Sequence, residues 1–236
     1  MSDAERHSRT EPYRVDESDL RFLGDLNQSL LSLESRLRRD VQPGELPVVI
    51  IGGLQRSGTT LLYQLLQCCC EIGYVSNLMA RFWRAPLVGA SLARMLLSES
   101  QHPSSDWNST YGVTEGPGGP NEFGYFWTER LHLDSTASHV LGDEEASRVD
   151  WAGLVKCLRQ VSSVFGMPFV LKNPVACLNA TRMFPHFPGL RLVLLRRDLF
   201  SVVQSTYLAR KERYGDATHW WSLKPPSFPR IRQEPD

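Results

Sequence analysis

The segment 47–66 constrains the fold of this chain most strongly. It reads PVVIIGGLQRSGTTLLYQLL, an apolar strand that leads directly into a glycine-rich loop and then into a helix. Such a loop can cradle a phosphate, because glycines let the backbone approach an anion and the helix N-terminus adds the positive end of its dipole. Residues 53–60 nearly fit the pattern G-x-x-x-x-G-K-[ST], but Thr59 stands where lysine belongs and the cation comes earlier, at Arg56. The sequence therefore predicts a site for a phosphate-like group that differs from an ordinary ATPase loop.

Two short apolar runs, 169–171 and 190–195, are typical of buried parallel strands because they carry no alternating polar residues. Asn173 and Pro174 predict the start of a helix between these runs, which completes a strand–helix–strand crossover. We therefore expect an α/β chain with a P-loop-like three-layer fold, in which helices flank a short parallel sheet. Hydrophobic periodicity predicts further helices at about 18–39, 78–97 with an interruption at Pro86, 143–165 and 199–212.

The pattern along the chain predicts one domain over residues 18–236 after a disordered start at 1–17. Residues 77–150 are expected to form a largely helical insertion that contributes the acceptor site and a lid. The lid is expected in segment 102–121, which contains GPGGP and is long for a connection within a compact domain.

Cations follow three of the predicted strands. Arg56 lies in the loop after the first strand, Lys172 follows the run at 169–171, and Arg197 belongs to the pair that follows the run at 190–195. The carboxyl ends of parallel strands meet at one edge of the sheet, where ligands collect. Burying these cations without partners would be very unfavourable, so the pattern predicts an anionic ligand at that edge.

Three segments carry a resemblance to a known family. They are LQRSGTTLL at 54–62, VLKNP at 170–174, and RDLFSVVQS at 197–205, in which an arginine is followed eight residues later by a serine. Together they resemble the sulfotransferases that use 3′-phosphoadenosine 5′-phosphosulfate (PAPS). The chain is most similar to the bacterial group and the tyrosylprotein sulfotransferases, which have arginine in the loop.

The resemblance implies PAPS as co-substrate, 3′-phosphoadenosine 5′-phosphate (PAP) as product, and a hydroxyl or, less readily, an amine as acceptor. It implies that Arg56 neutralises the leaving phosphate and that Lys172 lies beside the bridging oxygen. Arg197 and Ser205 would bind the 3′-phosphate. The backbone amides expected to hold the 5′-phosphate, with help from the threonine hydroxyls, are those of Ser57, Gly58, Thr59 and Thr60.

The general base is not evident from a motif. Ala176 stands where many family members have a histidine, and the position of the tyrosylprotein-type glutamate falls near Asn77. A hydroxyl acceptor needs a carboxylate or histidine within hydrogen-bond reach to take its proton. Glu122 is the preferred candidate and Glu115 the second, since both flank the GPGGP segment.

Two other functions remain open at this stage. One is a non-catalytic module that binds PAP or PAPS, which would explain the missing base motif. The stretch after Ser205 is also short and lacks the Gly-rich segment that usually covers adenosine in the family, so we expect the C-terminal portion to be incomplete. A P-loop kinase or NTPase is less favoured, because the P-loop lysine and a strand-end aspartate for Mg²⁺ are both missing.

Composition narrows the class of protein. Twenty-six basic and 26 acidic side chains give a formal net charge of zero, which argues against a general nucleic-acid binder. No apolar run is long enough to span a bilayer, and no secretory signal is evident. The five cysteines form no C-x-x-C pair, and the histidines show no metal-ligand spacing. We expect a cytoplasmic protein without a bound metal, of unassigned oligomeric state.

Overall fold

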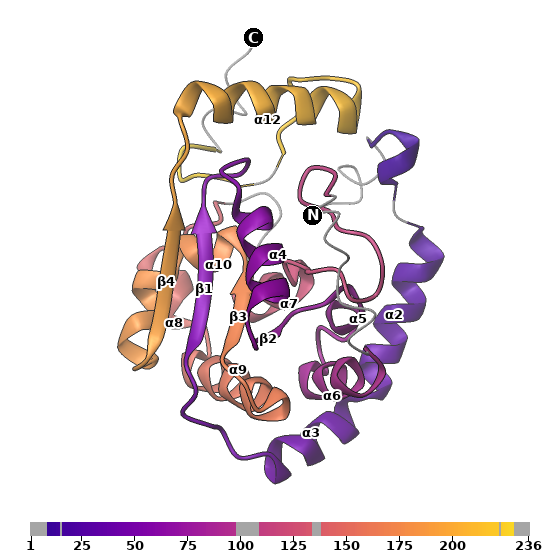
Figure 1. The fold of residues 1–236 in the computed structure, drawn as a ribbon, viewed down its shortest axis with the longest axis vertical. Helices are drawn as coiled ribbons and strands as arrows, with labels where there is room; N and C mark the ends of the chain where they lie inside the picture. Colours follow the sequence, from indigo (N-terminus) through magenta and orange to yellow (C-terminus); the bar gives the residue numbers. More distant parts are fainter. Residues whose placement is uncertain (1–8, 15, 98–108, 134–137, 222, 229–236) are drawn as a thin grey trace.

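A computed structural model describes residues 9–14, 16–97, 109–133, 138–221 and 223–228. Its centre is a parallel sheet of four strands in the order β2-β3-β1-β4 (Figure 1). The strands are β1 (Val48–Gly53), β2 (Gly73–Tyr74), β3 (Phe169–Lys172) and β4 (Leu190–Leu195). Because β1 pairs with both β3 and β4, the ends of these three strands lie at one edge of the sheet. The α/β class with a short parallel sheet is confirmed.

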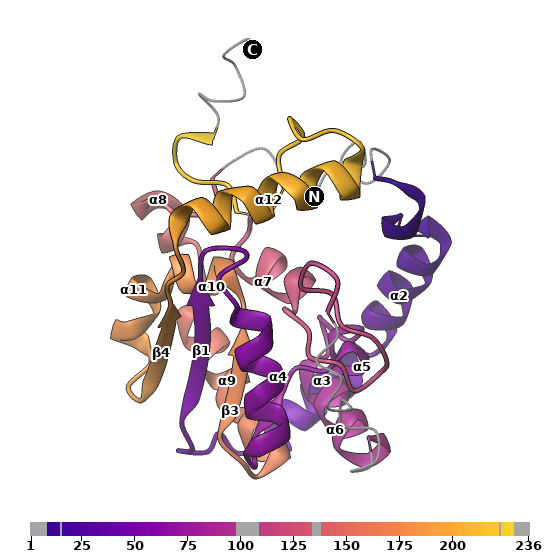
Figure 2. The ribbon, with the colours of Figure 1, turned by 45° about the horizontal axis from the view of Figure 1, so that its top comes forward.

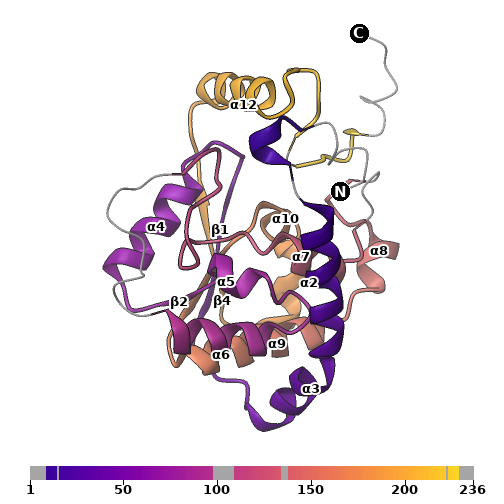
Figure 3. The same cartoon turned by 90° about the vertical axis from the view of Figure 1, so that its right-hand side faces the viewer.

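Helices cover both faces of the sheet. Helix α4 (Thr59–Cys69) lies on one face, and α9 (Trp151–Phe165) and α10 (Pro174–Leu178) lie on the other (Figure 3). On the α4 side, Tyr63 packs with Ile51 and Val170 in a small cluster. The larger apolar core lies on the opposite side, where α9 packs against α6 (Pro86–Leu96). The sheet is therefore the middle of three layers.

The other helical elements surround this core or precede it. They are η1 (Glu11–Tyr13), α2 (Glu17–Ser29), α3 (Leu31–Asp40), α5 (Asn77–Ala80), α7 (Gly124–Arg130), α8 (Asp143–Ser147), α11 (Ala180–Met183), η3 (Phe184–His186) and α12 (Leu199–Tyr214).

Several predicted helices are divided in the structure. The segment 18–39 forms two helices that meet at Leu30, although its leucine spacing continues across the break. The segment 143–165 breaks before Asp150, whose carboxylate accepts a hydrogen bond of 2.8 Å from the Gly153 amide and begins α9 as its N-cap. Strand β2 has only two residues and was not predicted, since so short a strand leaves no periodic pattern.

The prediction that 190–195 is a buried strand is wrong for half of its residues. β4 is an edge strand, and Val193 and Leu194 are 40% and 59% exposed. After β4 the chain does not return alongside the sheet. Instead α12 crosses above the carboxyl ends of the strands (Figures 1 and 2). This course leaves β4 partly uncovered and brings α12 over the loop between β1 and α4.

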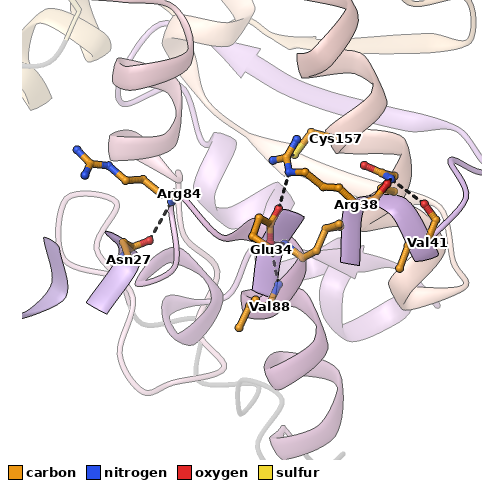
Figure 4. A network of polar contacts seen from close by, with 9 residues as sticks. Asn27, Glu34, Arg38, Val41, Arg84, Val88 and Cys157 are labelled. Carbon is orange, nitrogen blue, oxygen red and sulfur yellow. Dashed lines mark hydrogen bonds and ion pairs between the residues drawn. The ribbon is translucent and has the colours of Figure 1, made fainter. Parts of the chain in front are cut away.

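A buried carboxylate joins the N-terminal helices to the domain (Figure 4). Glu34 is 2% exposed and accepts hydrogen bonds from the amides of Leu87 and Val88, at 3.0 and 3.3 Å, at the start of α6. Arg38 Nε donates to the other Glu34 oxygen at 3.0 Å. Burial is the main cause that raises the pKa of Glu34, and Arg38 opposes it. The α6 N-terminus and Arg38 thus stabilise a charge that burial disfavours.

The start of the chain also contacts α12. Where disorder was expected up to residue 17, residues 9–14 include the short helix η1, and Thr10 donates its amide hydrogen to the Arg213 carbonyl at 2.8 Å. Residues 1–8 and 15 of that prediction lie outside the described residues. In the described part of the chain, no helix has the length and hydropathy needed to cross a membrane. The cytoplasmic location stays a prediction.

Candidate functional site

The loop between β1 and α4 has the tight backbone that its glycines predict. Gly53 has a φ of 148°, and a Cβ placed there would lie 2.6 Å from the Leu195 carbonyl oxygen on β4. Gly58 is the N-cap of α4 with a φ of 95°, and Arg56 also has a positive φ, 67°. The first amides of a helix have no partner within the helix, so the α4 N-terminus can bind an anion.

Ser57 provides a direct test of whether this loop fits an anionic ligand. Its side chain is buried, and its hydroxyl oxygen has no hydrogen-bond partner in the structure. Its amide, which was expected to face the 5′-phosphate, donates instead to the Leu54 carbonyl at 3.2 Å. An unpaired buried hydroxyl is unfavourable unless a ligand completes its bonding. The unpaired hydroxyl beside the α4 N-terminus fits a nearby anionic ligand, although Ser57 itself does not line the pocket described below.

Three predicted residues meet beside the loop. Arg56 Nε donates to the Ser205 hydroxyl at 2.9 Å, and Arg197 Nη1 donates to the Arg56 carbonyl at 2.9 Å. The Arg56 guanidinium also lies over the Tyr111 ring, 5.0 Å from its centroid. Burial is the main cause that lowers the pKa of Arg56; Arg197 lowers it further, whereas Tyr111 raises it. An anion bound between the two arginines would relieve both unfavourable effects.

A second cluster consists of three predicted site residues, Lys172, Thr60 and Glu122. Lys172 Nζ donates to the Thr60 hydroxyl at 2.9 Å and forms an ion pair with Glu122. The lysine side chain is only 8% exposed, whereas Glu122 is 42% exposed. Asn173 donates to the Glu122 carbonyl at 2.9 Å and caps α10, so the end of β3 positions both partners. A carboxylate therefore lies next to the buried ammonium group at the carboxyl edge of the sheet.

Asn77 was considered in the sequence only as a position that lacks a base, but it organises the second half of the expected lid segment. Its amide nitrogen donates to the carbonyls of Thr114 and Gly116 at 2.9 and 2.8 Å. Its backbone amide donates to Gly119, and its side-chain oxygen accepts from Asn121 at 2.8 Å. These bonds fix the GPGGP turn and, through Asn121, set the position of Glu122.

A pocket of about 460 Å³ joins the two clusters. Of the predicted site residues, those that line it are Arg56, Gly58, Thr59, Thr60, Glu122, Lys172 and Arg197. Ser57 and Ser205 do not line it, although Ser205 accepts a hydrogen bond from Arg56. Glu115 is exposed and does not line the pocket. Of the two predicted carboxylates, only Glu122 therefore lies beside Lys172.

The described part of the expected lid borders this pocket. Gly112 has a φ of 88°, and a Cβ there would lie 3.5 Å from the Thr60 hydroxyl and 3.7 Å from Lys172 Nζ. The neighbouring Tyr111 donates its hydroxyl to Glu212 on α12 at 2.5 Å. Residues 109–121 thus lie against the candidate catalytic groups, whereas 102–108 of the predicted lid lie outside the described residues.

A profile of the sulfotransferase family matches residues 47–227. The chain belongs to the sulfotransferase family. The match includes both clusters and the pocket between them, and it confirms the family resemblance drawn from the three segments.

Among solved structures, this chain is similar to sulfotransferase STF1 from Mycobacterium tuberculosis H37Rv. The two are 18% identical with a TM-score of 0.48, and the alignment covers 80% of this chain and 56% of the solved one. This chain thus spans little more than half the length of that protein. No curated protein sequence matched it.

The sequence analysis did not identify several residues that line the pocket. Tyr111, Trp221 and Arg213 line the pocket, but they come from three segments with no shared motif. One signal was available for Arg213. It follows Ser205 by eight residues on α12, and that spacing places both on the same side of a helix. In the described ranges, no group of three or more histidine, cysteine, aspartate or glutamate side chains could hold a metal ion.

Proposed function

We propose that this sulfotransferase transfers a sulfuryl group from PAPS to a hydroxyl group of its acceptor. The observation that carries the proposal is the meeting of Arg56, Arg197 and Ser205 beside the phosphate loop. A mononucleotide site needs one anion cradle, whereas PAPS carries phosphate groups at both ends of its ribose. The second group of donors next to the α4 N-terminus supports a ligand with two separate anions.

The donor-binding roles follow from this arrangement. The α4 N-terminus with Gly58, Thr59 and Thr60, which line the pocket, would bind the 5′-phosphate. Arg197, whose guanidinium can form paired hydrogen bonds with an anion, would bind the 3′-phosphate together with Ser205. When bound, PAPS supplies an activated sulfuryl group and a stable leaving phosphate. Arg56, held by Ser205 and Tyr111, stabilises the charge that develops on that phosphate.

We assign Glu122 as the general base that takes the proton of the acceptor hydroxyl. Its carboxylate lines the pocket and is half exposed, so an acceptor can reach it. Lys172, which is hydrogen-bonded to Thr60 at the start of α4, would stabilise the bridging oxygen of the donor. Thr59 in the place of the P-loop lysine argues against the kinase alternative.

Calorimetry with PAP and AMP tests donor recognition. Replacing Arg197 by alanine removes its proposed contacts to the 3′-phosphate as well as its hydrogen bond to the Arg56 carbonyl. We expect PAP affinity to fall about 10- to 100-fold, as for a lost charged hydrogen bond. AMP affinity should stay within about threefold, since AMP lacks that group. Arg196→Ala is the matched control, because Arg196 is exposed and does not line the pocket. Equal losses for PAP and AMP would contradict the role of Arg197. PAP binding without sulfuryl transfer would identify a non-catalytic module.

A further inference from the structure

Arg213 is a cation in the pocket for which the proposed donor site has no role. It lies in the last turn of α12 and lines the same pocket as Lys172 and Glu122. Two aromatic rings hold its guanidinium, with the Tyr13 centroid at 4.9 Å and the Trp221 centroid at 5.6 Å. These contacts fix the orientation of the group and leave its charge unneutralised.

No described carboxylate forms a salt bridge with Arg213, and its buried Nε has no hydrogen-bond partner. Glu212, next to it in sequence, accepts instead from the hydroxyls of Tyr111 and Tyr13. Burial is the main cause that lowers the pKa of Arg213 and the nearby Arg9 lowers it further, while Glu122 acts in the opposite direction. A partly buried guanidinium without an acidic partner indicates a site that an anionic ligand group can complete.

The position of Arg213 separates it from the donor-binding cations. Arg197 precedes α12 and Ser205 lies near its middle, whereas Arg213 lies two turns beyond Ser205, about 12 Å further along the helix axis. Glu122, the candidate base, lines the same pocket and is close enough to raise the pKa of Arg213, and Trp221 contacts the Arg213 guanidinium. Arg213 therefore lies near the carboxylate at which an acceptor would place its hydroxyl.

We propose that Arg213 selects the acceptor by binding an anionic group on it, an inference that rests on the proposed function. The substrate class is then a hydroxyl compound that also carries a carboxylate, sulfate or phosphate group. The planar guanidinium, fixed between two rings, presents its remaining N–H groups as a fork that matches such an oxyanion. Glu122 can take the hydroxyl proton of the same molecule from the neighbouring wall.

Two matched acceptor series test this selection with PAPS as donor. One consists of 4-hydroxyphenylacetate, its methyl ester and tyramine, and the other of glucuronate, glucose and glucosamine, so each has an anionic, a neutral and a cationic member. We expect the wild-type protein to favour the anionic member by about 10- to 100-fold in kcat/KM, the effect of a charged hydrogen bond. Arg213→Met should remove this preference, Arg213→Lys should keep much of it, and Arg213→Glu should shift it toward the cationic member.

Arg210 offers a matched control. It lies one turn earlier on α12, stacks over the Trp220 ring at 4.8 Å, and also has a buried Nε without a partner, but it does not line the pocket. Arg210→Met should therefore cost similar stability and leave acceptor preference unchanged. A wild-type protein without an anionic preference, including one that accepts no member of either series, overturns the proposal. So does a PAP affinity that falls more than threefold in Arg213→Met, since Arg213 would then bind the donor. Failure of the wild-type protein to bind PAP would instead refute the proposed function.

Discussion

The substitution Glu122→Gln separates the catalytic role of this carboxylate from its structural one. Glutamine keeps the size of the side chain and can still accept a hydrogen bond from Lys172, but it cannot take a proton. Because the Lys172 side chain is only 8% exposed, losing the carboxylate charge beside it should cost about 1–3 kcal/mol. Lys172 keeps its bond of 2.9 Å to Thr60. For a protein of this size, such a loss lowers Tm by about 2–12 °C.

The expected effect on catalysis is far larger. A positioned general base contributes roughly 10²- to 10⁴-fold to rate, or about 3–5 kcal/mol in the barrier. We therefore expect kcat for sulfuryl transfer to fall by at least about 10²-fold while PAP affinity changes less than threefold. Glu115→Gln is the control, since Glu115 is exposed and lies outside the pocket wall.

The assay combines transfer of labelled sulfate from PAPS to the best acceptor of the two series with calorimetric titration of PAP. Turnover by Glu122→Gln within threefold of the wild-type rate would refute the assignment of Glu122 as base. Loss of activity in Glu115→Gln instead would move that role to the second carboxylate predicted from the sequence. A parallel fall in PAP affinity would indicate that the substitution had disturbed Lys172 and the phosphate loop.

Two further predictions concern the folded state. Burial raises the pKa of Glu34 above its ordinary value of 4.5, so the stabilising contribution of this group is complete below pH 4.5 and is lost as pH rises through the raised pKa. Urea unfolding between pH 4 and 7 should therefore show a free energy of unfolding that falls with pH in the wild-type protein and falls less in Glu34→Gln. Identical pH dependences would contradict this reasoning. Gly53→Ala should cost about 2–4 kcal/mol of unfolding free energy and abolish PAP binding, because its methyl group would meet the Leu195 carbonyl at a strained φ. Gly24→Ala, in helix α2 with open space around it, should instead stabilise the protein by about 0.5–1 kcal/mol in the same assay, so a similar result for both glycines would be evidence against the steric argument.

The features that the sequence predicted correctly are those formed by residues close together in the chain. The strand, loop and helix at 47–66 are contiguous, so their conformations depend on local glycine geometry and apolar periodicity. The same holds for β3, the cap at Asn173 and the start of α12 at Asp198. These local signals, with their spacing, were enough to predict the parallel sheet and the edge at which Arg56, Lys172 and Arg197 meet.

Long-range packing decided the features that the sequence left open. Glu122 and Glu115 have similar local surroundings, and only the bonds of Asn77 and Asn173 bring the first of them to Lys172. Likewise, the apolar composition of 190–195 does not reveal that β4 lies at an edge of the sheet, because burial depends on which elements cover a strand.

By itself, then, the sequence determined the phosphate loop, the strand-end cations and the sulfotransferase family, since each depends on residues close together in the chain. Only the tertiary structure decided which distant side chains complete the site. Ser205 reaches Arg56 across 149 residues, Glu212 reaches Tyr111 across 101, and Arg213 joins the pocket wall from the end of α12. The physical reason is the path of α12 above the strand ends, a packing outcome that no local pattern specifies.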